Sequence, residues 1–147
     1  MPQKELISLM EENIYSMAML RDRLKMEKPV EYSRQQLMML MRLHIGGRAR
    51  LKDIARREFT TASNLCATFR KLEHDGLVRN AIDENDRRNT WYSVTPAGKK
   101  LAERILNEFR TGIATLFKDI SARDEEKLTG AMRTVNELLK KMRQDNL

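Results

Sequence analysis

Apolar residues recur at intervals of three and four along most of the chain, the spacing that places them on one face of a helix. This pattern predicts four helices in the first part of the chain, over residues 4–27, 33–45, 51–58 and 62–75. Two longer helices follow, one starting at Thr95-Pro96 and the other at Ser121. Ser33, Thr95 and Ser121 are predicted N-caps, because a short hydroxyl side chain accepts a hydrogen bond from a free N–H of the first helical turn.

The pattern changes between the fourth and the fifth predicted helix. Gly76–Ile82 and Thr90–Thr95 are rich in residues that favour strands, whereas Asp83–Asn89 is charged and has no apolar residue. The sequence therefore predicts two strands joined by an exposed loop, which together form a β-hairpin. Arg48-Ala49-Arg50 is too short to be predicted as a strand from its pattern, although it could pair with the hairpin.

Two short helices at a tight turn, followed by a β-hairpin, are the pattern of a helix-turn-helix with a wing. The turn is Phe59-Thr60-Thr61, and either threonine can cap the second helix. We predict a mainly α fold with a small β-hairpin wing, in a single domain over residues 1–147. Within it, a winged helix-turn-helix lobe (33–95) is flanked by N- and C-terminal dimerisation helices (1–32 and 96–147). The terminal helices have more apolar surface than this small lobe can cover, which predicts a homodimer.

The charge and composition of the chain narrow the choice of partner. Its formal net charge of +7 favours a polyanion such as double-stranded DNA, because Lys and Arg neutralise phosphates and release counterions. A single cysteine excludes an internal disulfide and agrees with a reducing compartment. The sequence has no apolar run of the roughly 18–20 residues that a membrane span needs, and no signal-peptide pattern. We therefore expect a cytoplasmic protein with no membrane partner.

Three motifs resemble the MarR family of bacterial transcription regulators. The first lies in the wing and consists of Asp83, Asp86, Arg88 and, after a strand, Val94-Thr95-Pro96-Ala97-Gly98. The second marks the end of the predicted recognition helix (62–75) and is Leu72-Glu73-His74-Asp75-Gly76-Leu77-Val78. The third lies in the first helix of the helix-turn-helix and is Leu51-x-x-Ile54-Ala55. The order of elements resembles the family over essentially the full length.

The chain also departs from the family pattern in its helix-turn-helix. Phe59 stands where many relatives have a small turn residue. Cys66 and Ala67 occupy positions where relatives often carry Thr and Arg, so the recognition helix lacks the arginine best able to bind guanine O6 and N7. The peroxide-sensing branch of the family places its reactive cysteine in the first helix, and this chain has none there.

The resemblance implies a DNA-binding transcriptional regulator, in the first place a repressor, that acts as a homodimer on a pseudo-palindromic operator. It also implies a small-molecule effector, often phenolic or aromatic, bound between the dimerisation helices and the DNA-binding lobes. Tyr15, Tyr32 and Met38 are candidates for such a pocket. Methionines at helical spacing are nevertheless more often core residues than ligand contacts.

Arg88 is the strongest candidate for DNA contact, because a wing-tip arginine can enter the minor groove, where the phosphate potential is most negative. Asp86 would accept from its guanidinium and orient it, and Arg87 would contact a phosphate. Candidates for the major groove on the recognition helix are Thr61, Ser63, Asn64, Thr68 and Lys71. Candidates for the flanking DNA backbone are Arg48, Arg50, Arg56 and Arg57. For each set the alternative is an ordinary solvated polar surface.

Two other functions are consistent with the sequence: a winged-helix module that binds protein, and a redox sensor or small enzyme based on Cys66. Cys66 lies at the margin of an apolar stripe, where a small buried hydrophobe is the commoner role. Together with His44 and His74 it lacks the spacing of a metal site. The sequence has no phosphate loop, nucleophile elbow or paired acid and base, so we predict no enzyme, no cofactor and no metal.

Overall fold

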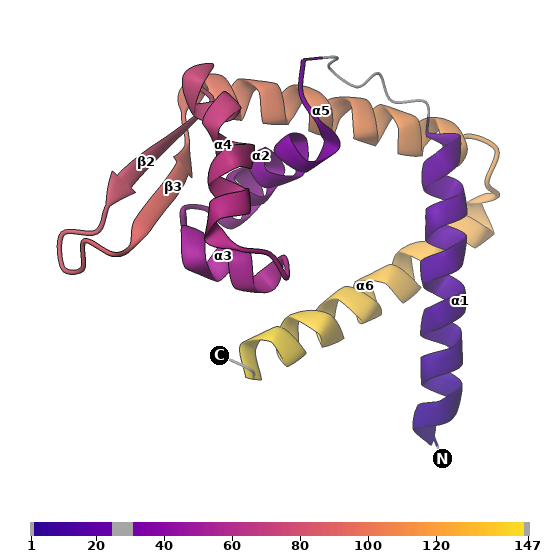
Figure 1. Ribbon diagram of the computed structural model, residues 1–147. Helices are drawn as coiled ribbons and strands as arrows, with labels where there is room; N and C mark the ends of the chain where they lie inside the picture. Colours follow the sequence, from indigo (N-terminus) through magenta and orange to yellow (C-terminus); the bar gives the residue numbers. More distant parts are fainter. Residues whose placement is uncertain (1, 25–30, 146–147) are drawn as a thin grey trace. The chain divides into compact units, whose positions relative to one another are not determined.

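The computed structural model describes residues 2–24 and 31–145. Within them the chain is mainly helical, with six helices and a small three-stranded antiparallel sheet, which confirms the predicted winged-helix fold class (Figure 1). The helices are α1 (Pro2–Arg23), α2 (Arg34–Gly46), α3 (Leu51–Arg57), α4 (Ala62–His74), α5 (Pro96–Leu116) and α6 (Ala122–Asp145). The strands are β1 (Ala49–Arg50), β2 (Val78–Ile82) and β3 (Thr90–Val94). Residues 25–27 of the first predicted helix lie outside the described residues.

The chain divides into two compact units, and the division falls inside α5. The terminal unit comprises Met1–Leu24 and Gly112–Leu147, and the lobe comprises Lys25–Thr111. The sequence assigned all of 96–147 to dimerisation helices, whereas the first part of α5 belongs to the lobe. Ala102, on that part of α5, is fully buried in the core of the lobe.

Polar side chains fix the starts of the helices, as predicted. Ser33 accepts a hydrogen bond from the Gln36 backbone N–H at 3.1 Å, and the Gln36 side chain accepts one from the Ser33 N–H, which completes a capping box. Thr61, rather than Thr60, caps α4 by accepting from the Asn64 N–H at 3.2 Å. Ser121 caps α6 in the same way. These bonds satisfy N–H groups that have no partner within the helix.

The core of the lobe is formed by α2, α3, α4, the sheet and the start of α5. The Phe69 ring of α4 stacks on Tyr92 of β3, with ring centroids 4.2 Å apart. This stack joins the recognition helix to the middle of the wing sheet. The fully buried large side chains are those of Leu40, Leu43, Ile54, Leu65, Phe69 and Leu72.

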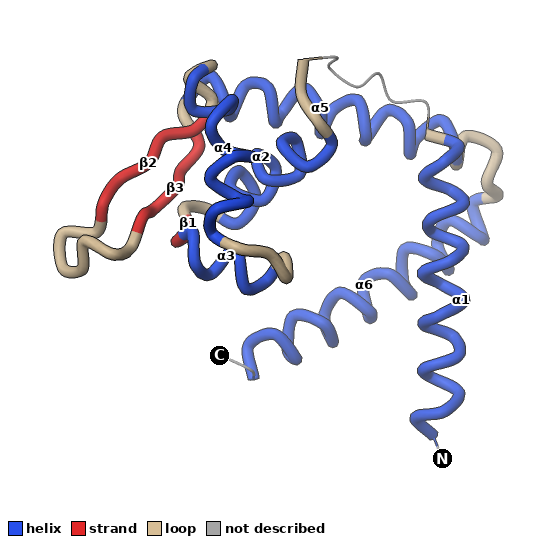
Figure 2. Tube along the Cα trace, in the orientation of Figure 1, coloured by secondary structure: helices blue, strands red, loops and turns tan. Residues whose placement is uncertain are grey.

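The sheet has the order β1-β3-β2, and Figure 2 shows its long hairpin beside the helices of the lobe. Arg48-Ala49-Arg50 does pair with the hairpin, because Ala49 lies opposite Tyr92 and Arg50 opposite Trp91. On the other side of β3, Asn80 lies opposite Tyr92. β3 is therefore the central strand and pairs with both neighbours.

A compact joint connects the end of α4, the base of the wing and the start of α5. The Leu77 carbonyl accepts from the Thr95 N–H at 3.0 Å, and the Thr95 hydroxyl donates to the Gly76 carbonyl at 2.5 Å. The same hydroxyl accepts from the Gly98 N–H at 3.1 Å, so Thr95 caps α5 as predicted. A Cβ at Gly98 would lie 1.9 Å from the Leu77 carbonyl oxygen. Only glycine permits this close approach of backbone to backbone.

The terminal unit differs from the lobe in its burial. None of its described residues, 3–24 and 112–143, is classed as buried, whereas the lobe has a continuous core. Among the helices that the structure describes, none is both long and apolar enough to cross a membrane.

Gly98→Ala should open the joint and destabilise the lobe by about 3 kcal/mol, the upper part of the range for overpacking. Gly46→Ala is the matched control, because nothing lies within 4 Å of the added Cβ at the end of α2. It should change the free energy of unfolding by less than about 1 kcal/mol. Urea unfolding at one protein concentration measures both variants. Equal stability of Gly98→Ala and the natural protein would show that the joint does not constrain the fold.

Candidate nucleic-acid interface

The loop between β2 and β3 is held by its own polar groups. Asp83 Oδ1 accepts from the Asn85 N–H at 2.9 Å, and Asp86 Oδ1 accepts from the Arg88 N–H at 3.1 Å. Each bond forms an Asx turn, in which a short acidic side chain closes the backbone two residues on. The Asn89 carbonyl accepts from the Asp83 N–H at 3.0 Å and closes the base of the loop. The prediction that the whole loop is exposed is wrong at Asn89, which is 7% exposed because it occupies this closing position.

Arg88 stands at the tip of the wing with its side chain 90% exposed. Its Nε lies 3.1 Å from Asp86 Oδ1 and its Nη2 lies 3.4 Å from Asp86 Oδ2. These bonds hold the pKa of Asp86 below its ordinary value. The predicted pairing of Asp86 with Arg88 is therefore present, and it orients a charged group that remains open to a ligand. Arg87 beside it is also exposed.

Trp91 connects this loop to the rest of the sheet. Its indole Nε1 donates to Asp83 Oδ2 at 3.1 Å. The guanidinium carbons of Arg48 and Arg50 lie 4.4 and 5.0 Å from the centroid of its ring. The two arginines predicted to clamp the DNA backbone are thus placed beside the wing by cation–π contacts. Sequence reasoning missed the role of Trp91, although an aromatic residue in a strand opposite an Arg-Ala-Arg segment is a usable signal.

The outer face of the recognition helix α4 is polar, as predicted, except at one position. Ser63, Asn64 and Lys71 are exposed, and Thr61 is exposed at the N-cap. Thr68 is only 9% exposed, and its hydroxyl donates to the Asn64 carbonyl at 3.2 Å. The prediction that Thr68 lies on the open face is therefore wrong, because it lies on the side of α4 that carries the buried Leu65 and Leu72.

A polar groove lies between the start of α2 and the first turns of α4. The residues that line it are Ser33, Gln35, Gln36, Thr60, Asn64, Ala67 and Thr68. Asn64 Nδ2 donates to Thr60 Oγ1 at 3.3 Å, which ties the helix to the preceding turn. The sequence did not predict Gln35 and Gln36 as site residues. The Ser-x-x-Gln pattern there indicates the start of a helix, but it does not indicate which other helix lies beside it.

Tyr32 lies in the core of the lobe and not in an open pocket. It is 8% exposed, and its hydroxyl donates to Asp75 Oδ2 at 2.7 Å. Burial and the neighbouring Asp75 carboxylate raise the pKa of Tyr32 to about 12. Lys71 Nζ lies 3.6 Å from the same carboxylate oxygen. This ion pair positions Lys71, a candidate for DNA contact, near the end of α4. The hydroxyl of Tyr32, a pocket candidate, is therefore bonded to Asp75 inside the lobe.

The remaining pocket candidates, Tyr15 in α1 and Met38 in α2, are 66% and 48% exposed. They belong to different units, and their participation in one pocket stays a prediction. Cys66 is half-buried and packs against the core. His44 Nε2 lies 2.7 Å from Glu103 Oε1, so this histidine joins α2 to α5. In the described part of the chain, no group of His, Cys, Asp or Glu could hold a metal ion.

The two arginines of α3 are both exposed. The Arg56 side chain is 79% exposed, with its Nη2 3.5 Å from Asp53 Oδ1. Arg57 is exposed on the last turn of the same helix. Glu58 forms an ion pair with Arg42 of α2, which fixes the end of α3 on its neighbour.

The geometry is that of a winged helix-turn-helix, and comparisons with known proteins agree. The model of the MarR family matches residues 32–90, the region from the start of α2 to the start of β3. YwaE, an HTH-type transcriptional regulator of Bacillus subtilis strain 168, is 36% identical over 75 residues, or 51% of this chain and 42% of YwaE. YwhA, an HTH-type transcriptional regulator of the same strain, is 28% identical over 83 residues, or 56% of this chain and 58% of YwhA. The matched region thus spans about half the length of these curated relatives.

The fold is similar to that of a solved MarR-like transcriptional regulator from Thermotoga maritima. The TM-score is 0.64 at 23% sequence identity, and the likeness covers 89% of this chain and 94% of the other. Residues 32–90 are therefore similar to the MarR family, and the fold over most of the chain is similar to that of a solved MarR-like regulator.

Acidification should release the Trp91 indole from Asp83 only at low pH. The Asn85 N–H, followed by the Trp91 N–H, holds the pKa of Asp83 below its ordinary value of 3.8. Because the pKa of Asp83 is lower in the folded protein, its carboxylate stays charged and keeps the bond at any pH above the ordinary value. The bond is lost as the pH falls through the lowered pKa of the folded protein. Trp91 is the only tryptophan, so its fluorescence should stay constant down to about pH 4 and change below it.

Asp83→Asn is the control for this titration, because an amide does not ionise in this range. Its Trp91 emission should lack the acid transition, while circular dichroism follows the helices of both proteins. The same transition in Asp83→Asn would show that the signal reports something other than this hydrogen bond.

Proposed function

We propose that this chain binds double-stranded DNA as a homodimer and regulates transcription from a pseudo-palindromic operator. The observation that carries the proposal is Arg88, braced by Asp86 at a 90% exposed wing tip. The wing is joined through Leu77 and Thr95 to the end of the recognition helix. A helix in the major groove and an arginine in the neighbouring minor groove would therefore be presented at a fixed separation.

The polar face of α4 suits the major groove. Ser63, Asn64 and Lys71 are exposed there, and an asparagine amide can pair with adenine through two hydrogen bonds. Arg56 and Arg57 extend the positive surface along α3, where they would contact phosphates. Half-site centres should lie about 10 bp apart, one turn of the DNA helix.

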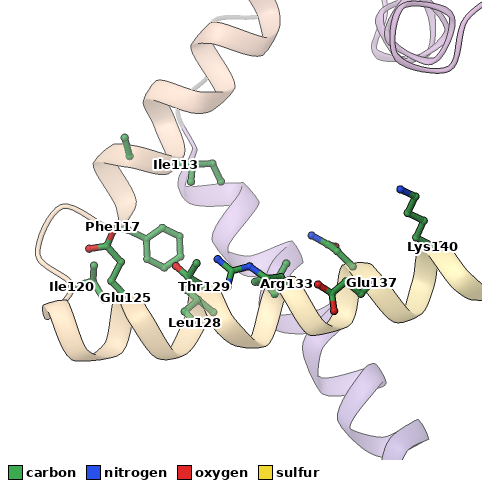
Figure 3. A pocket seen from close by; sticks show the side chains of 12 residues that line it. Ile113, Phe117, Ile120, Glu125, Leu128, Thr129, Arg133, Glu137 and Lys140 are labelled. Atoms are coloured by element: carbon green, nitrogen blue, oxygen red, sulfur yellow. The ribbon is translucent and has the colours of Figure 1, made fainter.

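The terminal unit supports the proposed homodimer. The residues of α6 at helical spacing, Leu128, Met132, Val135 and Leu139, are 41–50% exposed. Figure 3 shows Phe117, just after the end of α5, beside Leu128 and Thr129 at one end of a groove along α6. Because this unit has no buried residue among those described, a second copy of the chain is the occupant that would cover these apolar faces.

We further propose that the regulator is a repressor and that a phenolic or aromatic molecule releases it. Such an effector would act by favouring a conformation that does not fit the operator, which is a population shift. The support for this part is the resemblance to the family and the exposed Tyr15 and Met38. A lower operator affinity in the presence of a phenolic acid would support the effector, and an unchanged affinity across a panel of such acids would count against it.

Arg88→Ala should weaken operator binding by about tenfold, most at sites with A·T-rich flanks, because the narrow minor groove there attracts the guanidinium. The slope of log K against log salt should also become shallower by up to about 2 per dimer. Arg104→Ala, which removes an exposed arginine from α5, is the matched control. It should leave the operator affinity and the salt slope unchanged. Fluorescence anisotropy with an operator selected from a random DNA pool measures the affinities.

An Arg88→Ala affinity within about twofold of the natural protein would refute the minor-groove contact. If the natural protein retards no DNA at low salt, the winged-helix protein-binding module becomes the better hypothesis.

Val135→Glu should weaken self-association by about tenfold or more, because it would bury a carboxylate in an apolar interface. Operator affinity should fall with it. Lys141→Glu introduces the same group on another face of α6 and should leave the dimer intact. Sedimentation velocity over a concentration series distinguishes the variants, and circular dichroism checks their helices. A Val135→Glu dimer as stable as that of the natural protein would exclude this face from the interface.

A further inference from the structure

Phe59, in the turn between α3 and α4, combines two unfavourable features. Its backbone φ is +52°, in the left-handed region that bulky side chains rarely adopt. Among the described residues it is the only one other than glycine with a positive φ. Its side chain is 98% exposed, so the phenyl ring lies in water. The folded lobe thus gains no packing from the ring in return for the strained backbone.

The surroundings of the turn explain how the strain is maintained. The Thr60 N–H donates to the Ala55 carbonyl at 3.0 Å, and the Glu58 N–H donates to the Ile54 carbonyl at 2.9 Å. The Glu58 side chain also pairs with Arg42. The residues on both sides of Phe59 are therefore held by contacts with α2 and α3, and the ring between them points into solvent.

The position of the turn indicates what the ring meets. The next residue, Thr60, lines the polar groove and accepts a hydrogen bond from Asn64 of the recognition helix. Arg56, 79% exposed, and the exposed Arg57 lie immediately before the turn. The ring thus lies between two arginines and the start of the recognition helix. A partner that fits this place would be anionic and would also have apolar surface. Double-stranded DNA has both, through its phosphates and through its deoxyribose rings and thymine methyl groups.

We propose that Phe59 is an operator contact, and that its ring packs on the apolar surface of DNA at a thymine methyl group or an adjacent deoxyribose. The proposal rests on the proposed function and adds a residue that contributes to operator affinity. Ring burial on DNA would compensate for the strained turn only in the bound state. The residue would then contribute to binding while lowering the stability of the free protein.

Three substitutions separate the ring from the backbone. Phe59→Gly removes both the ring and the strain, so the melting temperature should be no lower than that of the natural protein, while operator affinity falls by about tenfold. Phe59→Asn should behave similarly, because asparagine tolerates positive φ but offers no apolar surface. Phe59→Leu keeps an apolar side chain and the strain, and should retain most of the affinity.

Deoxyuridine in place of thymine, one operator position at a time, identifies the contact. If the ring packs on a methyl group, one such position should weaken binding of the natural protein by about threefold to tenfold and leave Phe59→Gly unchanged. If Phe59→Gly weakens binding but no uracil substitution does, the deoxyribose is the contact. Both outcomes support the proposal.

Equal operator affinities of the natural protein, Phe59→Gly and Phe59→Asn would overturn the proposal and leave the proposed function intact. A lower melting temperature of Phe59→Gly together with unchanged affinity would show that the ring serves the fold. Failure of the natural protein to bind any selected DNA would overturn the proposed function, and this proposal with it.

Discussion

The backbone joint between Leu77 and Thr95 is the constraint on which the candidate interface depends. It holds together the end of the recognition helix, the base of the hairpin and the first turn of α5 through three hydrogen bonds that share one threonine. Gly98 permits the contact because any side chain would overlap the Leu77 carbonyl. The stack of Phe69 on Tyr92 supports the joint from inside the core. Helix and wing are therefore linked by contacts within the lobe, and these contacts fix the spacing of their exposed side chains in the structure.

The wing continues this preorganisation out to its tip. Two Asx turns shape the loop, and Trp91 anchors it to the sheet through Asp83. A loop of charged residues would otherwise lose conformational entropy on binding, a cost that reduces affinity. The aspartates of the motif thus have structural functions, and the arginines beside them contribute the positive charge. Because the aspartates bond within the loop and the arginines point outward, a loop rich in acidic residues can still belong to an interface proposed for an anion.

Local signals in the sequence were sufficient for the elements but not for their tertiary neighbours. Ser33 and Thr95 cap helices as predicted, and the wing motif forms the hairpin, because caps and turns depend on residues close together in the chain. The Tyr32–Asp75 bond joins residues 43 positions apart, and no local pattern indicates it. Thr68 was misplaced for the same reason, since its burial depends on packing that helical periodicity does not contain.

The two units differ in what stabilises them. The lobe has a buried core within a single chain, whereas the terminal unit has no buried residue among those described. Isolated helices with exposed apolar faces are marginal in water, so the terminal helices would depend on association for much of their stability. α5 starts at the joint of the lobe and ends in the terminal unit, and one helix is thus common to both. In the proposed dimer, α5 is therefore the covalent connection between the terminal helices, which associate, and the lobe that carries the joint of helix and wing.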